Sequence, residues 1–313
     1  MRTPDIARLQ IEVDKLQHAR MAVATERGYA HDWRTFRAWC ERAGRQALPA
    51  SPETLSLFVA DQLASKKVVT VCRYAAGVGF IHRREGFPSP LDGSVHQTLR
   101  GARRMRAEQP RQMQPLTVAQ LRSVCAWLEG QDTAVAIRGR AILLVGFASA
   151  IRRANLAALR VEDVTFCGEG MLLLIRREKQ NREGGAGRVV AVPFGRSQAT
   201  CPVRALEAWM AKRGSGSGPL FTRQDNASGT DIDPLSCNAI GKIVKSAIAG
   251  AGIDARQYGP HSLRSGFITE AGIAGASTLV IAAHVGHKSL ESTARYFRPA
   301  SLFRANCAGL VGL

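Results

Sequence analysis

Hydrophobic and aromatic residues in the first third of the chain recur every three or four positions, the spacing of one helical face. Residues 20–42 show this most clearly, because Tyr29, Trp33 and Phe36 fall on one stripe that we expect to face a core. Further helices are predicted over residues 53–64, 69–84 and 96–106. The pattern therefore predicts an all-helical domain over residues 1–107.

A polar stretch with two prolines, EQPRQMQP at residues 108–115, has the composition of a linker between domains. Directly after it, Thr117 and Gln120 have the spacing of a capping box, which predicts the start of a new helix. A second domain is therefore expected over residues 116–313.

The second domain mixes two kinds of pattern. Two β-rich runs, at residues 171–177 and 188–194, flank a glycine-rich turn and predict a β-hairpin. Helical spacing covers residues 137–149, 152–159, 202–212, 235–251, 261–274, 277–284, 289–298 and the segment from 301 onward. The predicted fold class is mainly α, with a small β-hairpin or sheet in the second domain.

The charge balance gives the first indication of function. The 313 residues include 43 Lys and Arg against 25 Asp and Glu, a formal net charge of +18. A hydrophobic content of 45% excludes a disordered basic tail, so the charge suggests a folded protein with a polyanionic partner such as DNA. Because 19 of the basic and 11 of the acidic residues precede residue 116, both domains are basic. We expect them to clamp one duplex from two sides.

Basic residues on and between the N-terminal helices are candidates for contacts to DNA phosphates, although each one alone is more often a solvated charge. They are Arg34, Arg37, Lys66, Lys67, Arg73, Arg83, Arg84, Arg100, Arg103, Arg104 and Arg106.

Other features limit where the chain acts. The longest mainly apolar run, residues 141–151, is too short for a membrane span, and the N-terminus lacks the apolar region of a secretory signal. Seven scattered cysteines without a C-x-x-C pair indicate reduced thiols and argue against a zinc site. We expect a cytoplasmic protein that acts at the nucleoid, without membrane contact.

Four short signals in the second domain carry the candidate chemistry, and none is specific alone. They are Arg152 after an apolar helix, Lys179 in the hairpin turn, the H-x-x-R pair of His261 and Arg264, and His287 nine residues before Tyr296. A second H-x-x-R pair, His31 and Arg34, stands among the N-terminal helices without the other signals, and we interpret it as a surface pair.

These residue types suit the cleavage of a phosphodiester. Two arginines can hold the non-bridging oxygens, as Arg152 and Arg264 would. A tyrosine hydroxyl is almost fully protonated at pH 7, so Tyr296 needs a base or cations nearby, and His261 can take its proton. Lys179 can protonate the departing 5′ oxygen, and His287 can donate to the phosphate. We expect no metal and no cofactor, since the sequence has no H-E-x-x-H motif, no carboxylate cluster and no Walker loop.

The order of these signals resembles that of the tyrosine recombinase, or phage integrase, family. The segments that carry the resemblance are ATERGYAHDWRTFRAWC, IRRANLAALRVEDV, REKQNREGGAGRVVAVP, HSLRSGFITEAG and HVGHKSLESTARYFRP. It implies that Arg152, Lys179, His261, Arg264, His287 and Tyr296 occupy the six catalytic positions, with Tyr296 as the nucleophile. One departure is Asn155, in a supporting position where family members usually have Glu or Asp.

The resemblance also implies the outcome of the reaction. Cleavage would leave a 3′-phosphotyrosine and a 5′-hydroxyl, rejoining would need no ATP, and strand exchange would pass through a Holliday junction. The implied function is site-specific recombination of double-stranded DNA, in integration, excision or dimer resolution. A homo-tetramer would act on two DNA sites and assemble through the C-terminal tail, residues 301–313.

Two other functions and one rival nucleophile stay open. A type IB topoisomerase-like enzyme would nick and close DNA with similar residues, and a silent DNA-binding regulator would keep only the fold. Tyr258, three residues before His261, is the rival to Tyr296.

Overall fold

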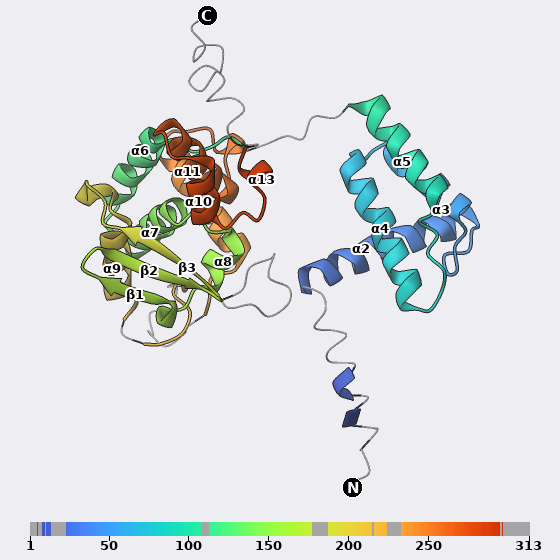
Figure 1. Cartoon of the computed structure of the whole chain (residues 1–313), viewed down its shortest axis with the longest axis horizontal. Helices are drawn as coiled ribbons and strands as arrows, with labels where there is room; N and C mark the ends of the chain where they lie inside the picture. Colours follow the sequence, from blue (N-terminus) through green and yellow to red (C-terminus); the bar gives the residue numbers. More distant parts are fainter. Residues whose placement is uncertain are drawn as a thin grey trace, which may run out of the picture. The chain divides into compact units, whose positions relative to one another are not determined.

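The structure is a computed structural model that describes residues 5, 8–9, 11–13, 23–107, 113–176, 187–214, 216–223, 233–294 and 296. The chain forms two compact units, Met1–Arg111 and Gln112–Leu313 (Figure 1). Helices dominate both units, and the one sheet among the described residues lies in the C-terminal unit, as the predicted fold class requires.

The N-terminal unit is built from helices whose apolar faces meet in an aromatic core. Its helices are α2 (Val23–Ala43), α3 (Pro52–Leu63), α4 (Val68–Arg84) and α5 (Gly93–Arg106). Phe36 and Phe58 are fully buried, with their ring centroids 5.1 Å apart in an edge-to-face arrangement. Trp33 packs against the same cluster. The predicted stripe on the first helix therefore faces the core at Trp33 and Phe36, whereas Tyr29 is half-buried.

Two buried polar groups tie this core together. Asp32 is fully buried and pairs with Arg73, whose Nη1 lies 2.9 Å from Oδ1. His82 is also fully buried: its Nε2 accepts from the Ala50 N–H at 2.9 Å, and its Nδ1 donates to the Val78 carbonyl at 2.9 Å. Burial lowers the pKa of His82, so its ring is neutral at pH 7.

The C-terminal unit packs its helices around α7, which is mainly apolar and buried along most of its length. The α-helices are α6 (Val118–Glu129), α7 (Ala134–Ala148), α8 (Arg153–Ala158), α9 (Pro202–Arg213), α10 (Cys237–Gly250), α11 (Pro260–Ile273), α12 (Thr278–Val285) and α13 (Leu290–Ala294). Short 3₁₀ turns are η1 (Val161–Asp163), η2 (Gln198–Thr200) and η3 (Ala255–Gln257). The predicted capping box at Thr117 and Gln120 starts α6.

A small antiparallel sheet, in the order β1-β2-β3, completes this unit. Its strands are β1 (Val164–Cys167), β2 (Gly170–Ile175) and β3 (Arg188–Pro193). The predicted hairpin corresponds to β2 and β3, whose last paired residues are Ile175 and Arg188. The sequence did not predict β1, which has only four residues.

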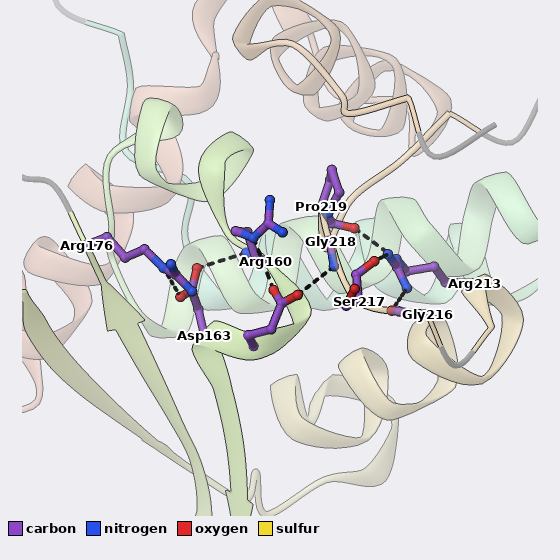
Figure 2. A network of polar contacts seen from close by, with 9 residues as sticks. Arg160, Asp163, Arg176, Arg213, Gly216, Ser217, Gly218 and Pro219 are labelled. Carbon is purple, nitrogen blue, oxygen red and sulfur yellow. Dashed lines mark hydrogen bonds and ion pairs between the residues drawn. The ribbon is translucent and has the colours of Figure 1, made fainter.

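An ion pair and backbone hydrogen bonds join the end of β2, η1 and a neighbouring loop (Figure 2). The buried carboxylate of Asp163 accepts from Arg176, just beyond β2, and from the backbone N–H of Arg160. Nearby, Glu162 accepts from the Gly218 N–H at 2.8 Å. The Arg176 pair anchors the end of β2 to η1, and the Glu162 contact anchors η1 to the segment before Pro219.

Candidate active site

The predicted first arginine follows a sharp break between two helices. α7 ends at Ala148 and α8 begins at Arg153, so the helix expected over residues 152–159 does not start until after Arg152. Ala150 lies in the left-handed region, with φ +49°, which is rare for a residue other than glycine. This turn ends α7 and leaves Arg152 at the N-cap of α8.

Helix α11 presents His261 and Arg264 one turn apart. Arg264 is only 3% exposed, and its Nη1 donates to the Ala150 carbonyl at 2.6 Å. On the other side of α11, the Leu116 N–H donates to the Ser262 carbonyl at 3.1 Å. A Cβ at Gly266 would lie 2.2 Å from the Leu116 oxygen, so a glycine is needed there. The segment around Leu116, at the start of the unit, therefore packs against α11 and holds it in position.

His287 is set by the end of α12. Gly286 is left-handed, with φ +69°, and the His287 N–H returns to the Ala282 carbonyl at 2.9 Å, which is the Schellman pattern of a helix end. Nδ1 of His287 lies 2.8 Å from the Thr293 hydroxyl of α13. The ring is therefore fixed on both its backbone and its side-chain ends.

Tyr296 lies between the two histidines. Its hydroxyl is 3.1 Å from Nε2 of His261, and its ring stacks beside His287 with centroids 6.0 Å apart and planes 16° from parallel. Its backbone N–H donates to the Thr293 carbonyl at 3.0 Å. The phenol thus faces a nitrogen that can accept its proton.

The two arginines set the electrostatics of this cluster. Although His261 is exposed overall, burial of its ring, followed by the charges of Arg264 and Arg152, lowers its pKa. Burial and the same arginines lower the pKa of His287 to about 4. Both rings are therefore neutral at pH 7, and the fixed positive charge comes from the arginines. Such a site favours an anion and contains a neutral base for a phenol.

Five of the six predicted catalytic residues thus come together: Arg152, His261, Arg264, His287 and Tyr296. Lys179 lies outside the described residues, as does the tail at 301–313. The rival Tyr258 is 5% exposed, and its hydroxyl bonds to other residues than the cluster. It accepts from Gln120 at 2.9 Å and donates to Gln114 at 3.2 Å. Tyr258 therefore fastens the start of the unit.

Asn155 sits on the first turn of α8, where its N–H donates to the Arg152 carbonyl at 2.8 Å. Its Nδ2 is buried and has no hydrogen-bond partner among the described residues. Because an amide is neutral, this side chain brings no negative charge to Arg152.

All of the DNA-contact candidates in the N-terminal unit are exposed, and so is the His31 and Arg34 pair. Several also hold the unit together. Arg103 donates to the Cys72 sulfur at 3.2 Å and Arg106 to the Lys66 carbonyl at 3.3 Å, which brings the start of α4 beside the end of α5. Arg73 holds the buried Asp32, a role that the sequence did not reveal.

Sequence reasoning missed Thr293, which contacts a residue of the cluster, and His284, which contacts the end of α7 just before it. Thr293 contacts His287, and its only signal is its position three residues before Tyr296. His284 donates to the Ala148 carbonyl, and its signal is a second histidine three residues before His287.

The described residues contain neither a candidate metal site nor a membrane-spanning helix. No group of three or more His, Cys, Asp or Glu side chains there is arranged to hold a metal ion. No described helix is long and apolar enough to cross a membrane.

Comparison with known proteins shows the family of this chain. The sequence profile of the Phage integrase family matches residues 114–301. The chain belongs to this family. Among its relatives, an integrase/recombinase XerD homologue of Selenomonas ruminantium is 30% identical over 303 residues, covering 96% of this chain and 88% of that protein. The Cre recombinase of Escherichia phage P1 is 26% identical over 286 residues, covering 85% and 81%. The predicted family and enzyme class, a DNA strand transferase that cleaves and rejoins DNA, are confirmed.

Solved structures share the phage integrase fold. The XerH recombinase in a post-cleavage complex with its difH substrate aligns with a TM-score of 0.65 at 17% identity, covering 91% of this chain and 79% of that one. A lambda integrase dimer bound to a COC′ core site aligns with a TM-score of 0.60 at 14% identity, covering 95% and 81%. Both likenesses concern the fold.

Proposed function

We propose that this phage integrase family member is a site-specific recombinase whose nucleophile is Tyr296. The observation that carries the proposal is the 3.1 Å approach of the Tyr296 hydroxyl to the neutral His261 ring, within the field of Arg152 and Arg264. A phenol beside a neutral base and an anion-binding arginine pair is suited to attack on a phosphodiester.

Each bond change has a proposed residue. The Tyr296 oxygen forms a bond to phosphorus while its proton passes to Nε2 of His261. The bond from phosphorus to the 5′ oxygen breaks, and Lys179 gives that oxygen a proton. Arg152 and Arg264 hold the non-bridging oxygens as negative charge builds on them. The products are a 3′-phosphotyrosine and a 5′-hydroxyl, and the reverse attack by another strand's 5′-hydroxyl rejoins the DNA without ATP.

The assembly we propose is a homo-tetramer on two double-stranded DNA sites, acting at the nucleoid in the cytoplasm. Each protomer clamps DNA between its two basic units, and the tail at residues 301–313 docks on a neighbouring protomer. An apolar surface on α12 supports a docked partner, because Leu279 and Val280 are 68% and 61% exposed.

The experiment is to map cleavage on duplexes taken from the DNA that flanks the gene. We expect a covalent adduct that retains the label of the upstream fragment's 5′ end. The downstream fragment should accept phosphate from polynucleotide kinase without prior dephosphorylation. An adduct on the 5′ end of the downstream fragment, or no adduct, would reject the proposal.

Two further assays separate the alternatives. Exchange of ends between two duplexes of different length supports a recombinase, whereas relaxation of supercoils without exchange supports the topoisomerase-like function. Deleting residues 301–313 should leave binding to a single site intact and abolish the tetrameric synapse. If the shortened protein forms synapses at the concentration that the full chain needs, the tail does not mediate assembly.

A further inference from the structure

His284 lies in the last turn of α12 and joins three parts of the C-terminal unit. Its Nε2 is 2.9 Å from the carbonyl oxygen of Ala148, the last residue of α7. Its ring stacks on Phe267 of α11, with centroids 4.6 Å apart and planes 22° from parallel. Its own carbonyl accepts from Nη1 of Arg188 in β3 at 2.7 Å. The imidazole is therefore held in one place from two sides.

The contact with Ala148 fixes the state of the ring. A carbonyl oxygen only accepts, so Nε2 of His284 must carry the hydrogen. Burial lowers the pKa of His284, and the charges of Arg188 and Arg264 lower it as well. The ring therefore donates from Nε2 as a neutral imidazole.

The acceptor, Ala148, begins the turn that carries the arginine chemistry. Two residues later Ala150 is held at φ +49°, a conformation that costs a non-glycine residue free energy and persists only when neighbours enforce it. The Ala150 carbonyl is the 2.6 Å acceptor for Arg264, and Arg152 follows as the cap of α8. A shift of this turn therefore moves both arginines.

We infer that His284 is a positioning residue: its hydrogen bond to Ala148, for which stacking on Phe267 orients the imidazole, holds the 148–152 turn so that Arg152 and Arg264 converge on the phosphate. Phe267 is one turn after Arg264 on α11, so the same imidazole braces both sides of the arginine pair. This inference rests on the phosphate-holding role proposed above for the two arginines.

A matched pair of amide variants tests it in the full-length chain. In His284→Gln the amide nitrogen reaches as far as Nε2 and can donate to Ala148, whereas in His284→Asn it is too short. We expect His284→Gln to cleave a duplex with the mapped site within about threefold of wild type, and His284→Asn to be slower by about ten- to a hundredfold. Affinity for the duplex should stay within about twofold in both.

The same duplex with sulfur in place of the bridging 5′ oxygen locates the defect. Sulfur scarcely needs a proton to leave, so Lys179→Ala should cleave it nearly as fast as wild type. The His284→Asn defect should persist undiminished, because the arginines are still needed for the non-bridging oxygens. A defect that disappears on sulfur, equal rates for the Gln and Asn variants, or parallel losses of affinity and rate would each overturn the inference.

Failure of the inference is distinguishable from failure of the proposed function. If Arg264→Ala cleaves like wild type, the arginine role is wrong, whatever the His284 variants do. If Arg264→Ala is inactive while His284→Asn cleaves like wild type, the arginine role stands and His284 does not position it.

Discussion

The candidate DNA contacts of the N-terminal unit and Arg264 of the C-terminal unit lie in opposite surroundings. In the N-terminal unit the candidate DNA contacts are all exposed and are spread over several helices. In the C-terminal unit Arg264 is 3% exposed, and its charge reaches His261, His284 and His287. Exposed charges are screened by salt and act as a sum, whereas buried charges act strongly at one point. We therefore propose that the exposed N-terminal charges bind DNA and that the buried arginine takes part in the reaction.

The largest effect should come from removing the buried arginine, Arg264. Arg264→Ala should slow formation of the covalent adduct by about 10²–10³-fold, because one donor to the developing charge is lost. DNA affinity should change little, since many other phosphate contacts remain. Single-turnover cleavage and a binding titration measure the two quantities on the same duplex. Equal losses of rate and affinity would mean that Arg264 only binds DNA.

The contribution of the exposed charges should appear in the salt dependence of DNA affinity. If the two units clamp DNA through about ten phosphates, log K should fall against log salt with a slope of about −9. The unit Gln112–Leu313 alone should lose roughly half of that slope. A binding isotherm series over salt concentration provides the measurement. A full-chain slope near about −2 would contradict the clamp.

An intermediate effect is expected when the pH is lowered, on the stability of the N-terminal unit. The pKa of His82 is lowered in the folded state, so the unfolded chain binds the proton more readily and stability rises with pH. The stabilisation is complete above the ordinary histidine value of about 6.5 and is lost below it, by at most about 1.4 kcal/mol per pH unit. Hydrogen exchange of α4 peptides from pH 8 to pH 5 measures this. His82→Gln should flatten the dependence, and an unchanged dependence would assign it to other groups.

The smallest effect should come from one exposed charge. Arg104→Ala is expected to reduce the salt slope by about one and to leave the cleavage rate of saturated enzyme unchanged. Arg73→Ala is the matched control on α4. It leaves the buried Asp32 without its ion-pair partner and should destabilise the unit in urea. If Arg104→Ala slows cleavage at saturating enzyme, the separation between the two units fails.

Much of this architecture could be predicted because its patterns are local. The aromatic stripe through Trp33 and Phe36 is core, and the hairpin appears at β2 and β3. Strand β1 escaped prediction because four residues are too few for a period to register. The helix end near residue 149 was predicted, but the left-handed conformation of Ala150 was not, because a left-handed alanine is enforced by tertiary contacts and has no local signal.

The site divides in the same way. Residue type and order nominated five residues that the structure brings together. The contacts that hold them, from His284 to Ala148 and from Thr293 to His287, join elements that the sequence pattern does not connect. Asp32 and Arg73 show the same limit in the N-terminal unit, since nothing local distinguishes an arginine that pairs with a buried carboxylate from one that meets a phosphate.

The central claim, that Tyr296 is the nucleophile, is tested most directly by comparing two single-atom variants. Tyr296→Phe and Tyr258→Phe each remove one hydroxyl, the first beside His261 and the second from the contacts with Gln114 and Gln120. Both are incubated with the mapped duplex, and adducts are counted on a denaturing gel. We predict that Tyr296→Phe binds DNA normally and forms no adduct, while Tyr258→Phe still forms one. An adduct with Tyr296→Phe and none with Tyr258→Phe would contradict the claim.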